Sequence, residues 1–542
     1  METLPSEIIT RILEYLSFDD RRELARVNKV FYHASSHPVF LKKELLSYEP
    51  YEFNLRNFRN FKNMLFKSIR KLLYLKFVNY SYIDDLTIFT NLGNYIISLN
   101  FIGLALLNDS FLDAITQCCS NLETLELINV VDLILTDNNR KPILKLCSIT
   151  LSGIHISDRD FNLILKLAPN LKDLSILDCN LIDEYLVIKR FYPHISNIDC
   201  SFTKYNSNDI FSKHNIIHHL NNFVRLNSLR LNESSNLFCQ IQPIQLEIKS
   251  LSLNLIETVY NHSIDYETLN LVLGQYVFLE QLEIFDLPSD LLSVVSKLYN
   301  LKHLTISYTT HHLNSFDCGK YVKSFVESLK NLKYIRTLSF IRPYNFNCYF
   351  DLPIYPFPEC TLKSLTSLDC CLDSNLGVLK YGKNLTSLRI RNGGILEVED
   401  LQLLFRNLTN LKHLWIDDCS VLNDEIFIKL SISNLKELIT LKITPSNISH
   451  RCLRHVTNSR LKILTLTAMS LEPCSTQAEL NEFRHSVEIL SRAVPKLTQL
   501  NICVHCRSLN TIESSDNLTY FKTIFKMLLT TYFKRLKILK LW

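Results

Sequence analysis

The stretch NLKHLWIDDCSVLNDEIFIKL, residues 410–430, carries two apolar periodicities in succession. Its first half places Leu411, Leu414, Ile416 and Cys419 in the spacing L-x-x-L-x-L-x-x-C. Leu414 and Ile416 alternate with residues that can face water, so a short strand would point both of them inward. The first half therefore predicts a strand with one buried face.

The second half of the stretch predicts a helix. Asn423 or Asp424 is suited to cap its first turn, and Ile426, Phe427 and Leu430 follow at the i, i+1, i+4 spacing of an apolar stripe. One strand and one helix cannot bury both apolar faces alone. The unit is therefore stable only when it stacks on copies of itself.

Such copies recur along the chain. An apolar residue followed by apolar residues three and five positions later occurs at 18 sites, and 464 residues separate the first site from the last, which gives a step of about 27 residues. The first residues of the sites are Leu72, Ile96, Leu122, Leu146, Leu171, Ile195, Leu226, Ile248, Leu279, Leu301, Ile335, Leu365, Leu385, Leu411, Leu438, Leu461, Leu497 and Leu536.

The residue between the last two apolar positions tests the pattern, because the search did not select it. It is polar at 17 of the 18 sites, with Trp415 as the exception, although 47% of the chain is hydrophobic. This alternation indicates strands, and the spacing and step are typical of leucine-rich repeats. The predicted fold is α/β, a leucine-rich-repeat solenoid shaped as a horseshoe with parallel strands on its concave face.

Composition narrows the class of protein. The chain of 542 residues has 59 Lys and Arg against 54 Asp and Glu, and its net charge of +5 is too balanced to indicate a nucleic-acid partner by electrostatics alone. Only 9 Gly and 15 Pro argue against long disordered linkers. Many of the 16 Cys fall at or just after strand positions, where a small buried hydrophobe is expected.

The cysteine usage and the N-terminus also predict a compartment. METLPSEIITRILEYL contains acidic residues and no apolar core followed by small residues, so no secretory signal is expected. Free thiols then place the protein in the cytoplasm, the nucleus or both. The uncharged run 87–108 is long enough to span a bilayer, but its several amides and its repeat register favour a repeat instead.

The first 46 residues do not fit the repeat and predict three helices. The first follows Leu4 and Pro5, because proline is tolerated in a helix's first turn. Its apolar residues recur at i, i+1, i+4, i+5 and i+8, as on one face of a helix. They are Ile8, Ile9, Ile12, Leu13 and Leu16.

A second helix is predicted to start at Asp20, which has capping-box spacing to Glu23, and to carry Leu24, Val27 and Phe31 on one face. A third helix is predicted over residues 38–46. The three helices carry more apolar residues than so small a core can bury, and surplus apolar surface indicates a partner.

The segment LPSEIITRILEYLSFDDRRELARVNKVFYHASSHPVFLKKEL resembles an F-box, the module that docks a substrate receptor onto the small linker subunit of SCF-type cullin ubiquitin ligases. The likeness rests on the helix spacing, the Leu-Pro entry and the Val-x-x-x-Phe signature. Two positions depart from the family pattern: Phe31 stands where Trp is usual, and Arg21 stands where an apolar residue often follows Asp. Apolar and aromatic character is otherwise kept, so docking is expected. The resemblance implies linker-subunit contacts from Leu4, Pro5, Ile8, Ile9, Ile12, Leu13, Leu16, Leu24, Val27 and Phe31.

The expected organisation is an F-box module at residues 1–46, a connecting helical segment at 47–70, and a solenoid with about 18 strands at 71–542. Cys179 and Cys419 stand at the ninth repeat position, so the array resembles the cysteine-type leucine-rich repeats commonly found behind an F-box. Uneven later steps predict insertions. These are an aromatic, proline-rich loop at 340–360 and helices at 480–490 and 520–529.

Motifs for catalysis and cofactor binding are absent from the sequence. It contains no G-x-x-x-x-G-K-[ST], G-x-S-x-G, H-E-x-x-H or G-x-G-x-x-G. Cys503 and Cys506 have the spacing of a zinc pair, but no second pair follows them. We expect no catalytic residue, no metal and no cofactor, and no enzyme activity.

Function is then expected on the surface, at the residues that flank the inward pair of each strand and line the concave face. The richest patch combines Trp and Arg, the residue types that dominate binding hot spots. Its members are Arg389, Arg391, His413, Trp415, Asp417 and Lys442. The alternative for Trp415 is that its ring packs beneath a loop.

The resemblance to an F-box, together with the repeat array, implies an intracellular substrate receptor of an SCF-type ubiquitin ligase. The F-box module would bind the linker subunit, and through it a cullin, while the array binds a protein target. No nucleic-acid or membrane partner is expected. The alternative is a leucine-rich-repeat scaffold or inhibitor whose N-terminal helices are only a cap, which solenoids need. A small-molecule sensor is a third, weaker interpretation.

Overall fold

The computed structural model divides the chain into two compact units. Unit 1 comprises residues 1–254 and 258–275, and unit 2 comprises residues 255–257 and 276–542. The structure describes residues 4–16, 18–41, 45–49, 55–67, 73–79, 86–136, 140–181, 194–201, 225–232, 247–254, 266–288, 294–309, 323, 325–341, 357–371, 376–391, 397–417, 422–430, 432–444, 448–470, 477–505, 532–533 and 538–541.

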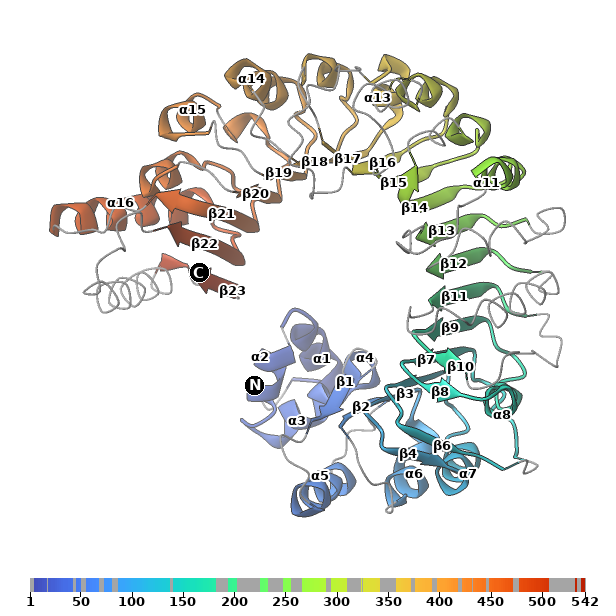
Figure 1. Cartoon of the computed structure of the whole chain (residues 1–542). Helices are drawn as coiled ribbons and strands as arrows, with labels where there is room; N and C mark the ends of the chain where they lie inside the picture. The colour runs from blue at the N-terminus through green and yellow to red at the C-terminus, as the bar shows by residue number, and fades with distance from the viewer. Residues whose placement is uncertain are drawn as a thin grey trace, which may run out of the picture. The chain divides into compact units, whose positions relative to one another are not determined.

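Unit 1 is built on a parallel sheet whose strands follow one another along the chain (Figure 1). They are β1 (Leu45–Tyr48), β2 (Tyr74–Val78), β3 (Ser98–Ile102), β5 (Thr124–Ile128), β7 (Ser148–Ser152), β9 (Asp173–Leu177), β11 (Asn197–Ser201), β12 (Ser228–Asn232) and β13 (Ser250–Asn254). Two small parallel pairs extend the turns that follow: β4 (Leu106–Asn108) with β6 (Asp132–Ile134), and β8 (His155–Ile156) with β10 (Asn180–Leu181).

The helices of unit 1 fall into two groups. An N-terminal module contains α1 (Ser6–Glu14), α2 (Phe18–Leu24), α3 (Lys29–Ser35) and α4 (Pro38–Leu41). The second group is α5 (Leu55–Lys67), α6 (Thr87–Leu92), the 3-10 helix η1 (Gly93–Tyr95), α7 (Asp109–Cys118), α8 (Asp158–Lys166) and α11 (Tyr266–Gly274). Asn108 and Ser157 cap α7 and α8 with their side chains.

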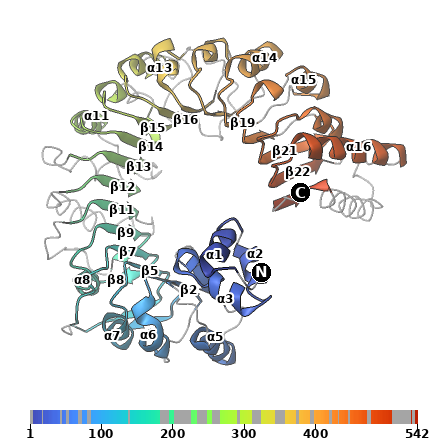
Figure 2. The same ribbon diagram turned by 180° about the vertical axis from the view of Figure 1, so that it is seen from behind.

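Unit 2 repeats the same plan, with helices along one side of its sheet (Figure 2). Its strands are β14 (Gln281–Pro288), β15 (His303–Thr309), β16 (Thr337–Ile341), β17 (Ser367–Cys371), β18 (Ser387–Arg391), β19 (His413–Asp417), β20 (Thr440–Thr444), β21 (Ile463–Ser470), β22 (Gln499–His505) and β23 (Ile538–Leu541). Its helical elements are η4 (Leu329–Asn331), α13 (Glu359–Ser364), η5 (Leu376–Tyr381), α14 (Val398–Asn407), α15 (Asp424–Lys429), η7 (Ile432–Asn434), η8 (His450–His455) and α16 (Gln477–Ala493).

A strand lies at each of the 18 predicted sites, and neighbouring strands are in register. Leu414 and Ile416 of β19 stand opposite Leu441 and Ile443 of β20, and all four side chains are buried. Between them Trp415 keeps part of its surface exposed on the opposite face. The predicted leucine-rich-repeat solenoid, with open parallel sheets and covering helices, is therefore confirmed.

A left-handed backbone position follows the first five repeat strands. Asn79, Gly103, Asn129, Gly153 and Asp178 have φ between 51° and 70° there. The amide of each of the first four donates to a carbonyl at the end of the next strand, as from Gly153 N to Leu177 O at 2.8 Å. Asn, Asp and Gly tolerate this conformation best, so the residue types follow from the backbone.

Asparagine side chains join neighbouring repeats at the turn before each strand. In five repeats the residue just before the first leucine is an Asn whose Nδ2 donates to a backbone carbonyl of the preceding repeat. The donors are Asn121, Asn170, Asn300, Asn384 and Asn410, at 2.6–2.9 Å. These bonds satisfy turn carbonyls that would otherwise lack a partner in the fold.

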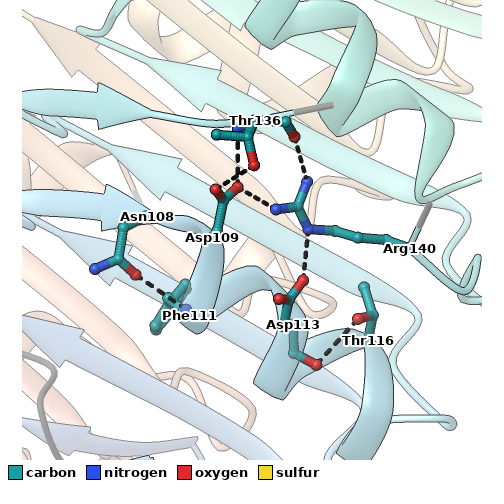
Figure 3. A network of polar contacts seen from close by, with 7 residues as sticks. All are labelled: Asn108, Asp109, Phe111, Asp113, Thr116, Thr136 and Arg140. Carbon is teal, nitrogen blue, oxygen red and sulfur yellow. Dashed lines mark hydrogen bonds and ion pairs between the residues drawn. The ribbon is translucent and has the colours of Figure 1, made fainter. Parts of the chain in front are cut away.

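A charged network fastens the segment before β7 to helix α7 (Figure 3). Arg140 Nε donates to Asp113 Oδ1 at 2.7 Å and Arg140 also pairs with Asp109. Thr136 N donates to Asp109 Oδ1 at 2.9 Å. Asp109 thus sits in the first turn of its own helix and binds the next repeat, while Asn108 caps the helix.

Aromatic rings link the start of the sheet to the first repeats. Tyr48 of β1 lies 4.6 Å from Phe61 of α5, and Phe61 lies 6.4 Å from Phe77 of β2, between ring centroids. Phe77 stacks on Phe101 of β3 at 5.2 Å, and Phe101 meets Phe111 of α7 at 5.0 Å. These distances are typical of favourable aromatic pairs.

Two predictions for the N-terminal segment are corrected. The second helix was expected to begin at Asp20 and reach Phe31, but α2 begins at Phe18 and ends at Leu24, and Asn28 starts a separate α3. The third helix was expected to reach residue 46, but α4 ends at Leu41 and β1 pairs in parallel with β2. Backbone pairing with a neighbouring strand outweighs helix propensity there, and the sheet starts ahead of the expected residue 71.

The outcome for the remaining predicted elements is mixed. Helix α16 covers the expected helix at 480–490, and α5 (Leu55–Lys67) lies within the connecting helical segment expected at 47–70. The run 87–108 forms α6, η1 and β3 rather than one long helix. The helix at 520–529 and most of the loop at 340–360 lie outside the described residues. None of the helices that the structure describes is both long enough and apolar enough to cross a bilayer.

Candidate docking surfaces

Helix α1 carries apolar side chains on two faces. Ile9 and Leu13 are 1% and 0% exposed and lie in the core of the N-terminal module. Ile8 and Ile12, each one position earlier, are 44% and 46% exposed. Because they are four residues apart, they adjoin along the helix surface. The module therefore leaves an apolar stripe in solvent after its own core is filled.

The core of the module accounts for part of the predicted docking set. Ile9 and Leu13 pack with Ala34 and Phe40, and Leu16, Leu24 and Phe31 pack half-buried against that cluster. The assignment of Ile9 and Leu13 as contact residues is corrected, because fully buried side chains cannot touch a partner. Their place in the core explains their spacing: they hold α1 so that its other side faces outward.

The exposed members of the predicted set are Leu4, Pro5, Ile8, Ile12 and Val27. Val27 is exposed because it lies in the turn between α2 and α3, where Asn28 Oδ1 accepts from Phe31 N at 2.9 Å and starts α3. Tyr15, which is 90% exposed, was missed. It stands seven residues after Ile8 and three after Ile12, so helical periodicity places it on the same stripe.

Arg21, which departs from the family pattern, is accommodated inside the module. Its Nη1 donates to Leu16 O at 2.7 Å, and its guanidinium lies 4.7 Å from the centroid of the Phe40 ring. The planar guanidinium covers an aromatic face of the core as an apolar side chain would, and it also satisfies the carbonyl after α1. The departure therefore preserves the packing of the module.

The second surface is the open face of unit 2, the sheet face that carries the middle residues Arg389, Trp415 and Lys442. Arg389 donates from Nε and Nη2 to Asp417 Oδ2 at 2.8 and 2.7 Å. Arg391 makes a two-bonded pair with Asp369, at 2.7 and 2.8 Å. Such paired guanidinium–carboxylate contacts fix both partners, so these arginines order the sheet surface.

Trp415 lies at the centre of this patch. It stands opposite Arg389 and Lys442 in the strand register, and the Arg389 guanidinium is 5.5 Å from its ring centroid. The indole is partly exposed, and Lys442 makes no hydrogen bond or ion pair with any residue that the structure describes. A ring held by a cation on one side and next to an uncommitted lysine can accept an acidic or aromatic group.

The remaining patch residues fix its edges. His413 Nδ1 is 3.1 Å from Thr440 Oγ1, and Thr444 Oγ1 donates to Asp417 Oδ1 at 3.0 Å. Asp417 thus binds an arginine of one neighbouring strand and a threonine of the other. The structure brings all six predicted residues onto three adjacent strands, and it adds Asp369 and Thr444, which no sequence signal marked.

Several titratable side chains inside the repeats have pKa values shifted by their surroundings. Burial raises the pKa of Cys119 to about 12 and of Cys179 to about 11, so both thiols are protonated at neutral pH. The pKa of Asp424 lies below its ordinary value. Burial by itself would raise this pKa, but the hydrogen bonds from Cys452 and Ser449 outweigh that effect. Among the described residues, no three His, Cys, Asp or Glu side chains are grouped so that they could hold a metal ion.

Comparison with known proteins separates the two parts of the chain. Residues 1–46 match the family described as F-box-like. No curated protein matches the chain in sequence. The complex of TLR13 with ssRNA13 is similar in structure, with 19% identity and a TM-score of 0.51 over 82% of this chain and 62% of that chain. This chain thus spans less than two thirds of that protein.

Two other solved structures are similar at lower scores. The complex of Rad7 and Elc1 in yeast gives 13% identity and a TM-score of 0.30 over 94% of this chain and 89% of that chain. The leucine-rich repeat-containing protein LegL7 from Legionella pneumophila gives 12% identity and a TM-score of 0.27, over 61% of this chain and 91% of that chain. Identities this low extend no further than the fold. The chain joins an F-box-like N-terminal segment to a leucine-rich-repeat solenoid.

Proposed function

We propose that the chain is the substrate-recognition subunit of an SCF-type cullin ubiquitin ligase. The observation that carries the proposal is the exposed stripe of Ile8, Ile12 and Tyr15 above a filled core, within the segment that matches the F-box-like family. Because a little under half of each isoleucine is exposed, covering it contributes roughly 1 kcal/mol. The stripe thus has the apolar surface needed to hold a linker subunit, and through it a cullin.

The chain's own contribution to the reaction is proximity. The N-terminal module binds the linker subunit, the repeat array binds a protein target, and a separate ubiquitin-charged enzyme performs the transfer. Holding both together raises the effective concentration of the charged enzyme at the target lysine. This role needs no catalytic residue in the chain. The cytoplasm and the nucleus are the proposed locations, in keeping with the free thiols of the described cysteines.

Co-purification with the linker subunit tests the docking step. Ile8→Asp with Ile12→Asp places two charges in the stripe and should reduce recovery of the linker subunit at least tenfold. Val131→Asp with Leu144→Asp is the matched control, because both side chains are more than 60% exposed on the array. The control should recover as much linker subunit as the wild-type chain. Equal recovery by the stripe variant, with its fold intact by circular dichroism, would refute docking through α1.

The open face of unit 2 is the proposed target surface. Because Arg389 and Arg391 are already bound by carboxylates, Trp415 and Lys442 are the residues left to contact a target. Capture with the proteasome inhibited should lose the ubiquitinated target with Trp415→Ala while the linker subunit is retained. If the Trp415→Ala and Lys442→Ala variants each recover as much target as the wild-type chain does, the target is recognised elsewhere.

A scaffold or inhibitor with a helical cap is the second candidate, and the pairing of β1 with β2 favours it. This pairing makes the N-terminal segment continuous with the sheet, as a cap is. Deleting residues 1–41 while keeping β1 separates the two functions. If residues 1–41 are a docking module, the shortened chain is soluble but no longer recovers the linker subunit. If they are instead a cap, the shortened chain aggregates.

A further inference from the structure

The turns that lead into the first strands of unit 2 share one pattern. Two exposed or half-exposed residues stand between two buried ones: Val277 and Phe278 before β14, Tyr299 and Asn300 before β15, and Lys333 and Tyr334 before β16. We name this row of three turns, together with Lys302 and Arg336, the turn edge. It is the edge at which the parallel strands begin.

Backbone and side-chain hydrogen bonds place the three turns side by side. Asn300 Nδ2 donates to Val277 O at 2.8 Å, which joins the turn of β15 to that of β14. Arg336 N donates to Lys302 O at 2.8 Å, which joins the turn of β16 to that of β15. Since neighbouring strands lie about 4.8 Å apart, the side chains of the turn edge form one continuous row.

Three aromatic rings stand in this row with most of their surface in solvent. Phe278, Tyr299 and Tyr334 are 56%, 51% and 58% exposed. Rings of this size contribute to a fold mainly when they are buried, so three exposed rings in consecutive repeats are costly without a ligand. No exposed large aliphatic side chain accompanies them in the three turns.

Cations surround the rings. Lys297, Lys330, Lys333 and Arg336 are exposed, and none of them forms an ion pair within the part of the chain that the structure describes. Lys302 alone is neutralised, by Glu280 at 2.7 Å. The pattern continues towards β18, where Lys380 lies 5.0 Å from the centroid of the Tyr381 ring and Lys383 is exposed.

The described turns of unit 1 lack a run of exposed aromatic rings in consecutive repeats. The turns before β5 and β9, Ser120-Asn121 and Pro169-Asn170, carry neither charge nor aromatic ring. Asn94-Tyr95 before β3 carries one ring, 40% exposed, and Leu144-Lys145 before β7 carries one lysine, whose Nζ donates to Asn121 Oδ1 at 2.6 Å. The repeat itself therefore does not require the basic and aromatic residues.

We propose that the turn edge of unit 2 binds single-stranded nucleic acid. Unpaired bases stack on Phe278, Tyr299 and Tyr334, and the lysines and Arg336 neutralise the phosphates between them. A duplex keeps its bases stacked inside and offers the rings little. A membrane surface is entered by a broad apolar face rich in Trp, Phe and Leu, and Phe278 is the one exposed residue of these three types in the three turns. The surface is separate from the stripe on α1.

Fluorescence anisotropy on the full chain, with oligothymidylate and oligouridylate of about twenty nucleotides as probes, tests the proposal. Tyr299→Ala with Tyr334→Ala should weaken binding at least tenfold, whereas Tyr299→Phe with Tyr334→Phe should retain it, because stacking needs only the ring. Lys330→Ala, Lys333→Ala and Arg336→Ala combined should weaken binding at least tenfold and reduce the slope of log affinity against log salt by about 2.

The matched control removes three exposed cations from the same edge of unit 1: Lys172→Ala, Arg225→Ala and Lys249→Ala. It should change the affinity less than twofold. An equal loss in this control, or wild-type affinity in the tyrosine-to-alanine variant, would overturn the proposal. Tighter binding of a poly-glutamate peptide or of phosphatidylserine vesicles than of either oligonucleotide would overturn it too. Linker-subunit recovery should stay unchanged in every variant, so this test fails or succeeds independently of docking.

Discussion

Helices α1 and α7 use similar apolar residues to different ends. α7 buries Phe111, Leu112 and Ile115 and exposes no large apolar side chain. α1 buries Ile9 and Leu13 but leaves Ile8, Ile12 and Tyr15 in solvent. The apolar face of α7 is covered by the repeats around it, whereas α1 has only a small module beneath it. The difference shows that apolar spacing predicts a packed face, but not whether a second face is left for a partner.

The largest effect is expected from exchanging a buried residue of α7. Leu112→Ala should cost about 2–5 kcal/mol of unfolding free energy, because the surrounding repeats cannot close the cavity. Ile12→Ala in α1 should change stability by less than about 0.5 kcal/mol, since its side chain already faces water. Denaturant unfolding followed by circular dichroism measures both. A similar loss in the two variants would remove the distinction between the helices.

The next largest effect is expected at Gly153, where a Cβ atom would meet Asn129 Oδ1 and φ is +62°. Gly153→Ala should cost about 1–3 kcal/mol, part from the left-handed backbone and part from the contact. Adding Asn129→Gly removes the contact and should restore the second part. Thermal melts of the single and double variants separate the cost of the left-handed backbone from the cost of the contact. If the losses of the two single variants simply add in the double variant, the contact with Asn129 does not contribute.

The carboxylate of Asp424 gives an expected pH dependence. It accepts from Ser449 N at 2.6 Å and from Cys452 Sγ at 2.9 Å, and its pKa is lowered. Its contribution to stability is present above the unfolded-state pKa of about 3.9 and is lost as the pH falls through the lower folded value. Asp424→Asn should therefore lower the melting temperature at pH 7 but much less near pH 3. A difference that grows on acidification would contradict this linkage.

The smallest effect is expected at Arg21. Arg21→Ala removes the bond to Leu16 O and the contact with Phe40, and should cost about 1 kcal/mol in the stability of the module. Recovery of the linker subunit should not change, because the Arg21 guanidinium is directed at Leu16 O and the Phe40 ring within the module and not at a partner. Hydrogen exchange of the α1 amides reports the stability. A lost interaction with the linker subunit would place Arg21 in the docking surface instead.

Sequence patterns predicted the repeat strands because period-two alternation depends only on which side chains are buried. They were less informative where a residue's neighbour comes from elsewhere in the chain. Leu45 looked helical, yet β2 offers it a backbone partner. Ile9 looked like a contact residue because a docking face and a core face share the same spacing on α1. The two arginines of the open face looked available until Asp369 and Asp417 were found beside them.

The aromatic contacts from Tyr48 to Phe111 decide where this protein can be cut. A fragment starting at the apparent boundary near residue 71 strips Phe77 of the Phe61 ring, which in turn rests on Tyr48. Phe77 supports Phe101, so damage at the cut spreads into the first two repeats. A soluble array for crystallisation or binding assays should therefore begin before Leu45, and shorter versions should be protease-sensitive through α7.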